Sequence, residues 1–166
     1  MTELVTERTR DIVARSLPIV RQHKDQIVGA MEIYLRRMED DRKTFGRSDV
    51  AAMILTELLL RQASLIAGGG QVAGLETTAL EHASLGIDGR HYSRFGDALV
   101  PILRDSLGFN LPREVSSAWS DTFWSIIRAA QAKQALTDRG ANRSVPRVEG
   151  PRRARGTSYE AMLGQP

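Results

Sequence analysis

The chain has 166 residues, of which 42% are hydrophobic and 26% charged, a composition typical of one globular domain with its own core. It contains no cysteine, which excludes disulfides, thiolate metal ligands and cysteine nucleophiles. The net charge is +3, and the excess lies in residues 135–166, which hold six arginines and three acidic residues. The rest of the chain is neutral overall, so this charge indicates nothing about the ligand of the main domain.

The N-terminal stretch MTELVTERTRDIV is charged throughout and lacks the apolar region of a secretory signal. No apolar run approaches the roughly 20 residues that a membrane-spanning helix needs. We therefore expect a cytoplasmic protein without a membrane partner.

Apolar residues recur at helical spacing through the first part of the chain. One helix is expected over residues 6–23, where Pro18 should bend or divide it. A second helix is expected over residues 24–40, and a polar turn that contains Phe45 follows it.

The middle of the chain predicts two further helices. Residues 48–67 carry the strongest apolar pattern, with Ser48 or Asp49 as the N-cap, and three successive glycines end the helix. A short helix then runs from residue 71 to about residue 84, and Gly86 is placed to cap its end.

Two amphipathic helices complete the predicted fold. The first covers residues 91–108 and contains Pro101, which costs about 3 kcal/mol inside a helix unless the helix kinks. The second begins at Asn110, has Pro112 in its first turn and ends near residue 136. The sequence carries no strand or hairpin pattern, so the predicted fold class is all-α.

Beyond about residue 136 the helical pattern fails. Residues 135–166 are rich in arginine, glycine and proline and poor in large apolar side chains, so we expect a flexible, disordered basic tail behind a domain of residues 1–134. The arginines could bind nucleic acid or another acidic partner, but the charge density is modest. A solvated linker is the favoured interpretation.

The sequence offers few motifs for catalysis or metal binding. The glycine-rich stretch AGGGQVAG follows a helix rather than a strand, so it is not a phosphate-binding loop. No nucleophile elbow and no metal-binding histidine spacing occur, and the three histidines lie far apart. We therefore expect neither an enzyme nor a metal site built from protein ligands alone.

His82 stands out because it lies on an apolar helical face that includes Leu75, Ala79 and Leu85. One histidine is enough to hold a metal when a cofactor such as haem brings the iron. The alternative is a buried structural histidine whose ring is satisfied by one backbone carbonyl.

The stretch EHASLGIDGRHYSRFGDALVPILRDSLG, followed by AWSDTFWSII, resembles the bacterial single-domain haemoglobins and the globin domain of flavohaemoglobins. The first-helix sequence LPIVRQH is also similar to that family. The resemblance covers residues 6–134 and is most specific in the C-terminal half. The matching positions, in chain order, are His82, Gly86-Ile87, His91-Tyr92, Leu107-Gly108 and Ala118-Trp119.

This resemblance implies a globin-like fold of six to eight helices that binds haem b, with His82 as the proximal iron ligand and His91 as a turn residue. The implied function is reversible binding of a diatomic gas, which is O₂, NO or CO. The other residues implied to contact the cofactor are Phe45, Val50, Ile54, Leu85, Ile87, Tyr92 and Phe95.

The sequence departs from the family on the distal side of the implied pocket. The family's distal glutamine falls on Val50, and its distal tyrosine falls on Met31 or Glu32. An unusually apolar distal pocket implies that O₂ binding weakens more than CO or NO binding. The carboxylate that partners the proximal histidine and tyrosine becomes Gln134, which disfavours peroxidase-like chemistry and efficient NO dioxygenation.

The resemblance also bears on partners. Globins often pair through their last two long helices, which implies a homodimer, and Trp124 is expected to be exposed for such a contact. The alternative function is a globin-fold sensor or interaction module that lacks haem and acts through its surface and basic tail.

Overall fold

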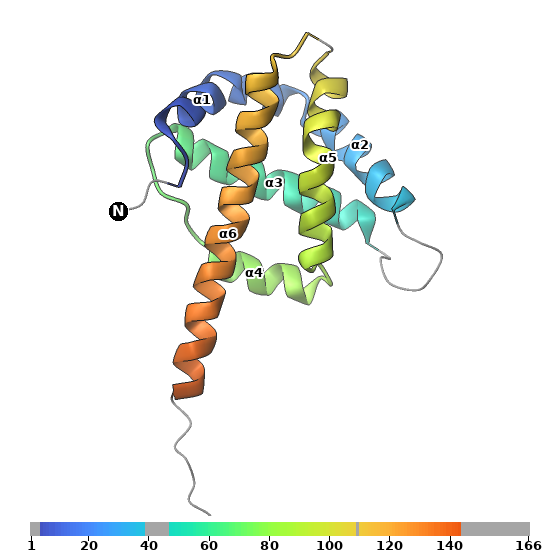
Figure 1. Cartoon of the computed structure of the whole chain (residues 1–166). Helices are drawn as coiled ribbons and strands as arrows, with labels where there is room; N and C mark the ends of the chain where they lie inside the picture. Colours follow the sequence, from blue (N-terminus) through green and yellow to red (C-terminus); the bar gives the residue numbers. More distant parts are fainter. Residues whose placement is uncertain (1–3, 39–46, 109, 144–166) are drawn as a thin grey trace, which may run out of the picture.

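The computed structural model describes residues 4–38, 47–108 and 110–143, except for the side chains of residues 136–143. Within that part the chain forms helices and no strand, so the all-α class predicted from the sequence is confirmed. The helices, shown in Figure 1, are α1 (Glu7–Gln22), α2 (Lys24–Arg37), α3 (Ser48–Ala67), α4 (Leu75–Ser84), α5 (Gly89–Leu107) and α6 (Arg113–Arg143).

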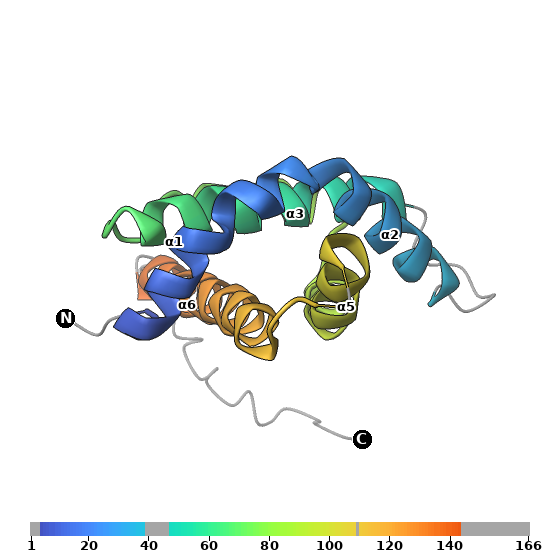
Figure 2. The ribbon, with the colours of Figure 1, turned by 90° about the horizontal axis from the view of Figure 1, so that it is seen from above.

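The helices pack in two layers. α5 and α6 lie side by side in front of α3, which crosses behind both of them (Figure 1). Seen from above, α2 and α3 lie together on the opposite side from α5 and α6, and α1 runs from α6 toward α3 (Figure 2). The short helix α4 packs mainly against α6, and α3 is not among its extensive helix contacts.

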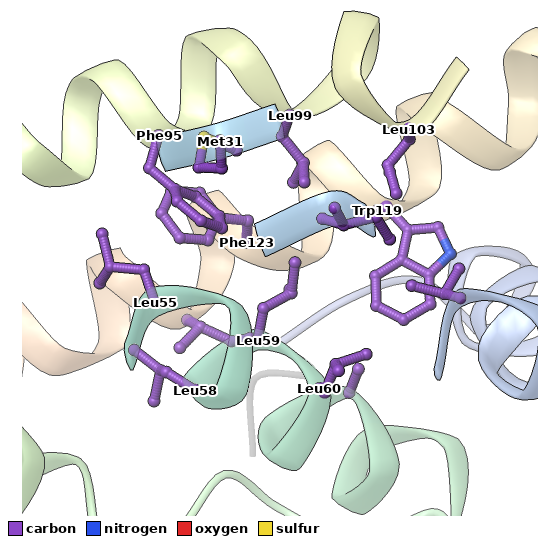
Figure 3. Close-up of a cluster of buried hydrophobic side chains, with 14 of the residues drawn as sticks. Met31, Leu55, Leu58, Leu59, Leu60, Phe95, Leu99, Leu103, Trp119 and Phe123 are labelled. Atoms are coloured by element: carbon purple, nitrogen blue, oxygen red, sulfur yellow. The ribbon is translucent and has the colours of Figure 1, made fainter. Parts of the chain in front are cut away.

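The core lies where α3, α5 and α6 meet. The rings of Phe95 and Phe123 are 4.9 Å apart between centroids, and Trp119 is fully buried one turn before Phe123 (Figure 3). The Trp119 indole N–H donates to the Ser16 hydroxyl at 2.9 Å, which joins α6 to α1 inside the core. This bond satisfies the one polar atom of a large buried aromatic side chain.

Two helices begin at positions that differ from the sequence prediction, and a third has a different N-cap residue. α3 starts at Ser48 with Arg47 at the N-cap, so no side-chain hydrogen bond caps it. α6 starts at Arg113, and Pro112 belongs to the preceding turn, where its carbonyl accepts from the Val115 N–H. α4 starts only at Leu75, because Gly74 before it adopts a left-handed conformation with φ +68°.

The two prolines do not divide their helices. Pro18 lies within α1 and Pro101 within α5, and both helices are continuous. Each proline is exposed, so the carbonyl that loses its helical partner can be hydrated at the surface.

α6 ends at Arg143, beyond residue 134, where the sequence places the end of the domain. The remainder of the predicted tail, residues 144–166, lies outside the described residues.

α3 is the one helix in the described part of the chain that is long and apolar enough to cross a membrane, which the sequence analysis did not expect. Its most apolar window is 56% buried within the protein. That burial is the pattern of a core helix, since a helix at the centre of a globular domain is apolar on several faces.

Trp124 is half-buried rather than exposed, because its indole packs against Gly96 where α6 crosses α5. A Cβ atom at residue 96 would lie 2.3 Å from Cζ2 of this ring. Gly96 therefore permits the close approach of the two helices.

We predict opposite effects for two Gly→Ala substitutions in helices. Gly29→Ala in α2 meets no atom within 4 Å, so better helix propensity should raise the free energy of unfolding by up to about 1 kcal/mol. Gly96→Ala should lower it, because displacing the indole costs about 1–3 kcal/mol. Denaturant melts monitored by circular dichroism measure both. Equal stabilisation by the two substitutions would contradict the packing described.

Candidate functional site

His82 lies in the last turn of α4 and is 3% exposed. The end of that helix fixes its backbone. Gly86 takes a left-handed conformation with φ +78°, and the Ile87 N–H donates to the His82 carbonyl at 2.9 Å. This is the glycine-terminated helix end that the sequence predicts.

The His82 side chain is held by Tyr92. His82 Nδ1 and the Tyr92 hydroxyl oxygen are 2.7 Å apart, and the two rings lie 5.8 Å apart between centroids. The partner is thus a side-chain hydroxyl of α5 and not the backbone carbonyl of the structural alternative. The contact joins the end of α4 to the beginning of α5.

The first turn of α5 is fixed by a reciprocal cap. The Asp88 carboxylate accepts from the backbone N–H groups of Arg90 and His91, and His91 Nδ1 accepts from the Asp88 N–H at 3.1 Å. His91 is buried inside this turn of helix, and so is not the loop residue that the resemblance implies. The cap sets the helical register that brings Tyr92 to His82.

Both rings of the pair are neutral near pH 7. Burial lowers the pKa of His82 below its usual 6.5; the charge of Glu81 opposes this shift and that of Arg61 adds to it. Burial raises the pKa of Tyr92 to about 12, and Asp88 adds to that shift. A neutral imidazole carries a lone pair on one nitrogen, as a metal ligand must.

His82 Nε2 has no hydrogen-bond partner among the described residues. No fully buried side-chain nitrogen or oxygen atom of those residues lacks a partner, so Nε2 keeps accessible surface. His82 lines a cavity of about 490 Å³. Cavities of roughly 300–1,000 Å³ are typical of small-molecule sites.

The cavity lies between α3, α4 and the junction of α1 with α2. Its apolar lining comes from Ile54, Leu58 and Leu60 of α3 and from Leu85 after α4. Its polar and charged lining consists of Arg21, Lys24, Glu57, Arg61, Thr78, Glu81 and His82.

The residues predicted to contact a cofactor are not all brought together. Three of them line the cavity, namely His82, Ile54 and Leu85. Four others lie outside it. Tyr92 touches His82 from α5, Ile87 and Phe95 are buried in the core, and Val50 is half-buried on α3. Phe45 lies outside the described residues.

The positions predicted for distal polar groups also lie away from the cavity. Met31 is fully buried in the core beside Phe95 (Figure 3), and Glu32 pairs with Arg36 on α2. Gln134, where the family has a carboxylate, is exposed on α6. None of these side chains lines the cavity.

The sequence analysis missed the charged lining of the cavity. On α3, Glu57 and Arg61 share the helix face of Ile54 and Leu58, since these positions are three or four residues apart. That spacing is visible in the sequence. It does not reveal that α4 presents its own face, with His82, across a cavity.

The buried side-chain amide of Gln62 in α3 hydrogen-bonds to the segment that connects α3 to α4. Gln62 is fully buried; its Nε2 donates to the Ala73 carbonyl at 2.8 Å, and its Oε1 accepts from the Ala73 N–H at 3.2 Å. Next to it, the Arg61 guanidinium donates to the Thr78 hydroxyl at 3.0 Å. These bonds fix α4 relative to α3 and therefore fix the two walls of the cavity.

The arrangement suits binding rather than protein-only metal chemistry. The described residues hold no cluster of three or more histidine, aspartate or glutamate side chains that could bind a metal ion. What they hold is one buried imidazole in the lining of a cavity with an apolar wall and several charged side chains. Such a site fits a large apolar ligand that brings its own metal.

Comparisons of the chain with protein-family models, with curated proteins and with solved structures give no significant match. No family assignment follows from them.

We predict that His82 makes the ligand-free protein less stable in mild acid. Because its pKa is below 6.5 in the folded state, its contribution to stability is complete above pH 6.5 and is lost as the pH falls through the folded-state pKa. The free energy of unfolding should therefore decrease between about pH 7.5 and about pH 5. His82→Gln should flatten this dependence, and His23→Gln, which removes a histidine outside the cavity, should not. An unchanged slope in His82→Gln would show that the imidazole is not desolvated.

Proposed function

We propose that the chain is a haem-binding globin that reversibly binds a diatomic gas, with His82 as the single protein ligand of haem b. One observation carries this proposal. His82 is buried, its Nδ1 lies 2.7 Å from the Tyr92 hydroxyl oxygen, and the residue lines a cavity of about 490 Å³ with an apolar wall. Haem needs only one protein ligand on its proximal side.

The residues present fit this cofactor because the two nitrogens of the His82 imidazole can have different roles. Iron ligation through Nε2 requires His82 to carry its proton on Nδ1 and to donate it to the Tyr92 hydroxyl oxygen, which lies 2.7 Å away. Burial keeps the ring uncharged, so the lone pair is available near neutral pH. Leu58 and Leu85 exclude water from the adjoining wall. When bound, haem supplies an iron with one open coordination position for the gas.

The α3 wall of the cavity bears on ligand choice. Ile54 and Leu58 present no hydrogen-bond donor, and Arg61 on the same helix face lies at the polar boundary of the cavity, where it donates to Thr78. A gas whose binding depends little on a distal donor is therefore favoured, which places CO and NO ahead of O₂. The apolar distal side carries this preference.

A second candidate function is a haem-free globin-fold module that acts through its surface and tail. One observation favours it. Phe95, a residue implied to touch haem, is completely buried and stacks against Phe123 with 4.9 Å between ring centroids. Met31 packs in the same core (Figure 3), so this part of the interior is filled by protein side chains.

Titration with haemin tests the proposal. The full chain should bind haemin saturably and give a Soret band, and His82→Ala should lose that spectrum because no nitrogen remains to coordinate the iron. Tyr92→Phe should retain it with about tenfold weaker binding, since partners of metal ligands typically contribute that much. His23→Ala serves as the matched control.

A helical protein that shows no saturable binding, or a Soret spectrum indifferent to His82→Ala, would contradict haem ligation and favour the haem-free module. Circular dichroism of each variant establishes that it is folded.

A further inference from the structure

A second cavity adjoins the one at His82. It has a volume of about 660 Å³ and lies beside the α3–α4 connection. The two cavities share four lining residues, which are Arg21, Arg61, Thr78 and Glu81. The shared boundary between them is therefore polar, whereas the wall near His82 is apolar.

The charged side chains at this boundary are not all paired with an opposite charge. Lys24 and Glu57 neutralise one another in an ion pair of 2.5 Å. Arg21 makes no hydrogen bond or ion pair with any other described residue, and Arg61 uses one guanidinium nitrogen for the Thr78 hydroxyl. Glu81 is the one remaining acid in the lining, so the two arginines leave a positive excess.

The geometry points to a partner for these arginines. A guanidinium offers planar paired donors that match a carboxylate, and it cannot lose its charge at neutral pH. Arg21 comes from the end of α1 and Arg61 from α3, so the two lie on separate elements at the boundary of the same apolar cavity. The Thr78 bond restrains Arg61 before any ligand arrives.

We propose that Arg21 and Arg61 bind the carboxylates of a ligand whose apolar body lies against Ile54, Leu58 and Leu85. The shared chemistry is a carboxylate on a large apolar framework, found both in porphyrins and in long-chain fatty acids. The porphyrin form rests on the proposed function. The carboxylate contact itself requires neither iron nor His82.

An iron-free ligand separates this contact from iron ligation. In the fluorescence titration of the full chain with protoporphyrin IX, Arg21→Gln and Arg61→Gln should each weaken binding by about three- to tenfold, and the double variant should weaken it further. Arg15→Gln is the matched control, because Arg15 also lies on α1 but bonds the Asp11 carbonyl and lines neither cavity.

The dimethyl ester of protoporphyrin IX tests the same contact without any mutation. It lacks the negative charges, so it should bind more weakly than the free acid, and its affinity should not respond to the arginine substitutions. Raised salt should weaken binding of the acid and not of the ester.

Oleate, measured by competition with a fluorescent fatty acid, distinguishes the two sources of the carboxylate. Arginine-dependent binding of oleate without binding of porphyrin would support the carboxylate contact and contradict haem as the cofactor. Equal affinities of acid and ester, together with arginine variants that bind like the unmodified chain, would overturn the proposal even if His82 ligates haem iron.

Discussion

The contact between His82 Nδ1 and the Tyr92 hydroxyl is the interaction on which the site depends. It occupies one nitrogen of a buried imidazole and leaves the other without a partner at the wall of a cavity. A neutral buried histidine has two nitrogens to satisfy, and a structural role usually satisfies both inside the protein. Here the residue lines a cavity that a ligand could fill, and its second nitrogen has no hydrogen-bond partner among the described residues. The proposals for haem and for the carboxylate contact both use this space, through different residues.

The rest of the fold keeps this contact in place from three directions. The left-handed Gly86 ends α4 just after His82, and the cap formed by Asp88 and His91 starts α5 just before Tyr92. The Gln62 amide holds the connection that enters α4 from the other end. Because α4 packs chiefly on α6, its face toward α3 stays open at the cavity while its backbone remains fixed.

Helical periodicity in the sequence predicts the all-α class and the apolar helical face that carries His82, whereas the proximity of Tyr92 to His82 is implied by the resemblance to the bacterial globins. Periodicity reports which face of a helix is buried and not what it is buried against, so it does not reveal that Phe95 packs on Phe123. The two hydrogen bonds between the Gln62 side chain and the Ala73 backbone could not be predicted, because a glutamine in an apolar run does not indicate a backbone partner eleven residues further along the chain. The charged boundary formed by Arg21 and Arg61 depends on how distant helices meet, which local sequence does not encode.

The tautomer of His82 tests the account most directly. Two-bond ¹H–¹⁵N correlation spectra of the ligand-free, ¹⁵N-labelled chain distinguish a protonated from an unprotonated imidazole nitrogen. The histidine signals that shift in the Tyr92→Phe variant identify His82. The account predicts that His82 carries its proton on Nδ1, donated to Tyr92, and that Nε2 is unprotonated near neutral pH. A proton on Nε2, with the Tyr92 hydroxyl donating to Nδ1, would contradict it, because Nε2 would then have no lone pair to offer a metal.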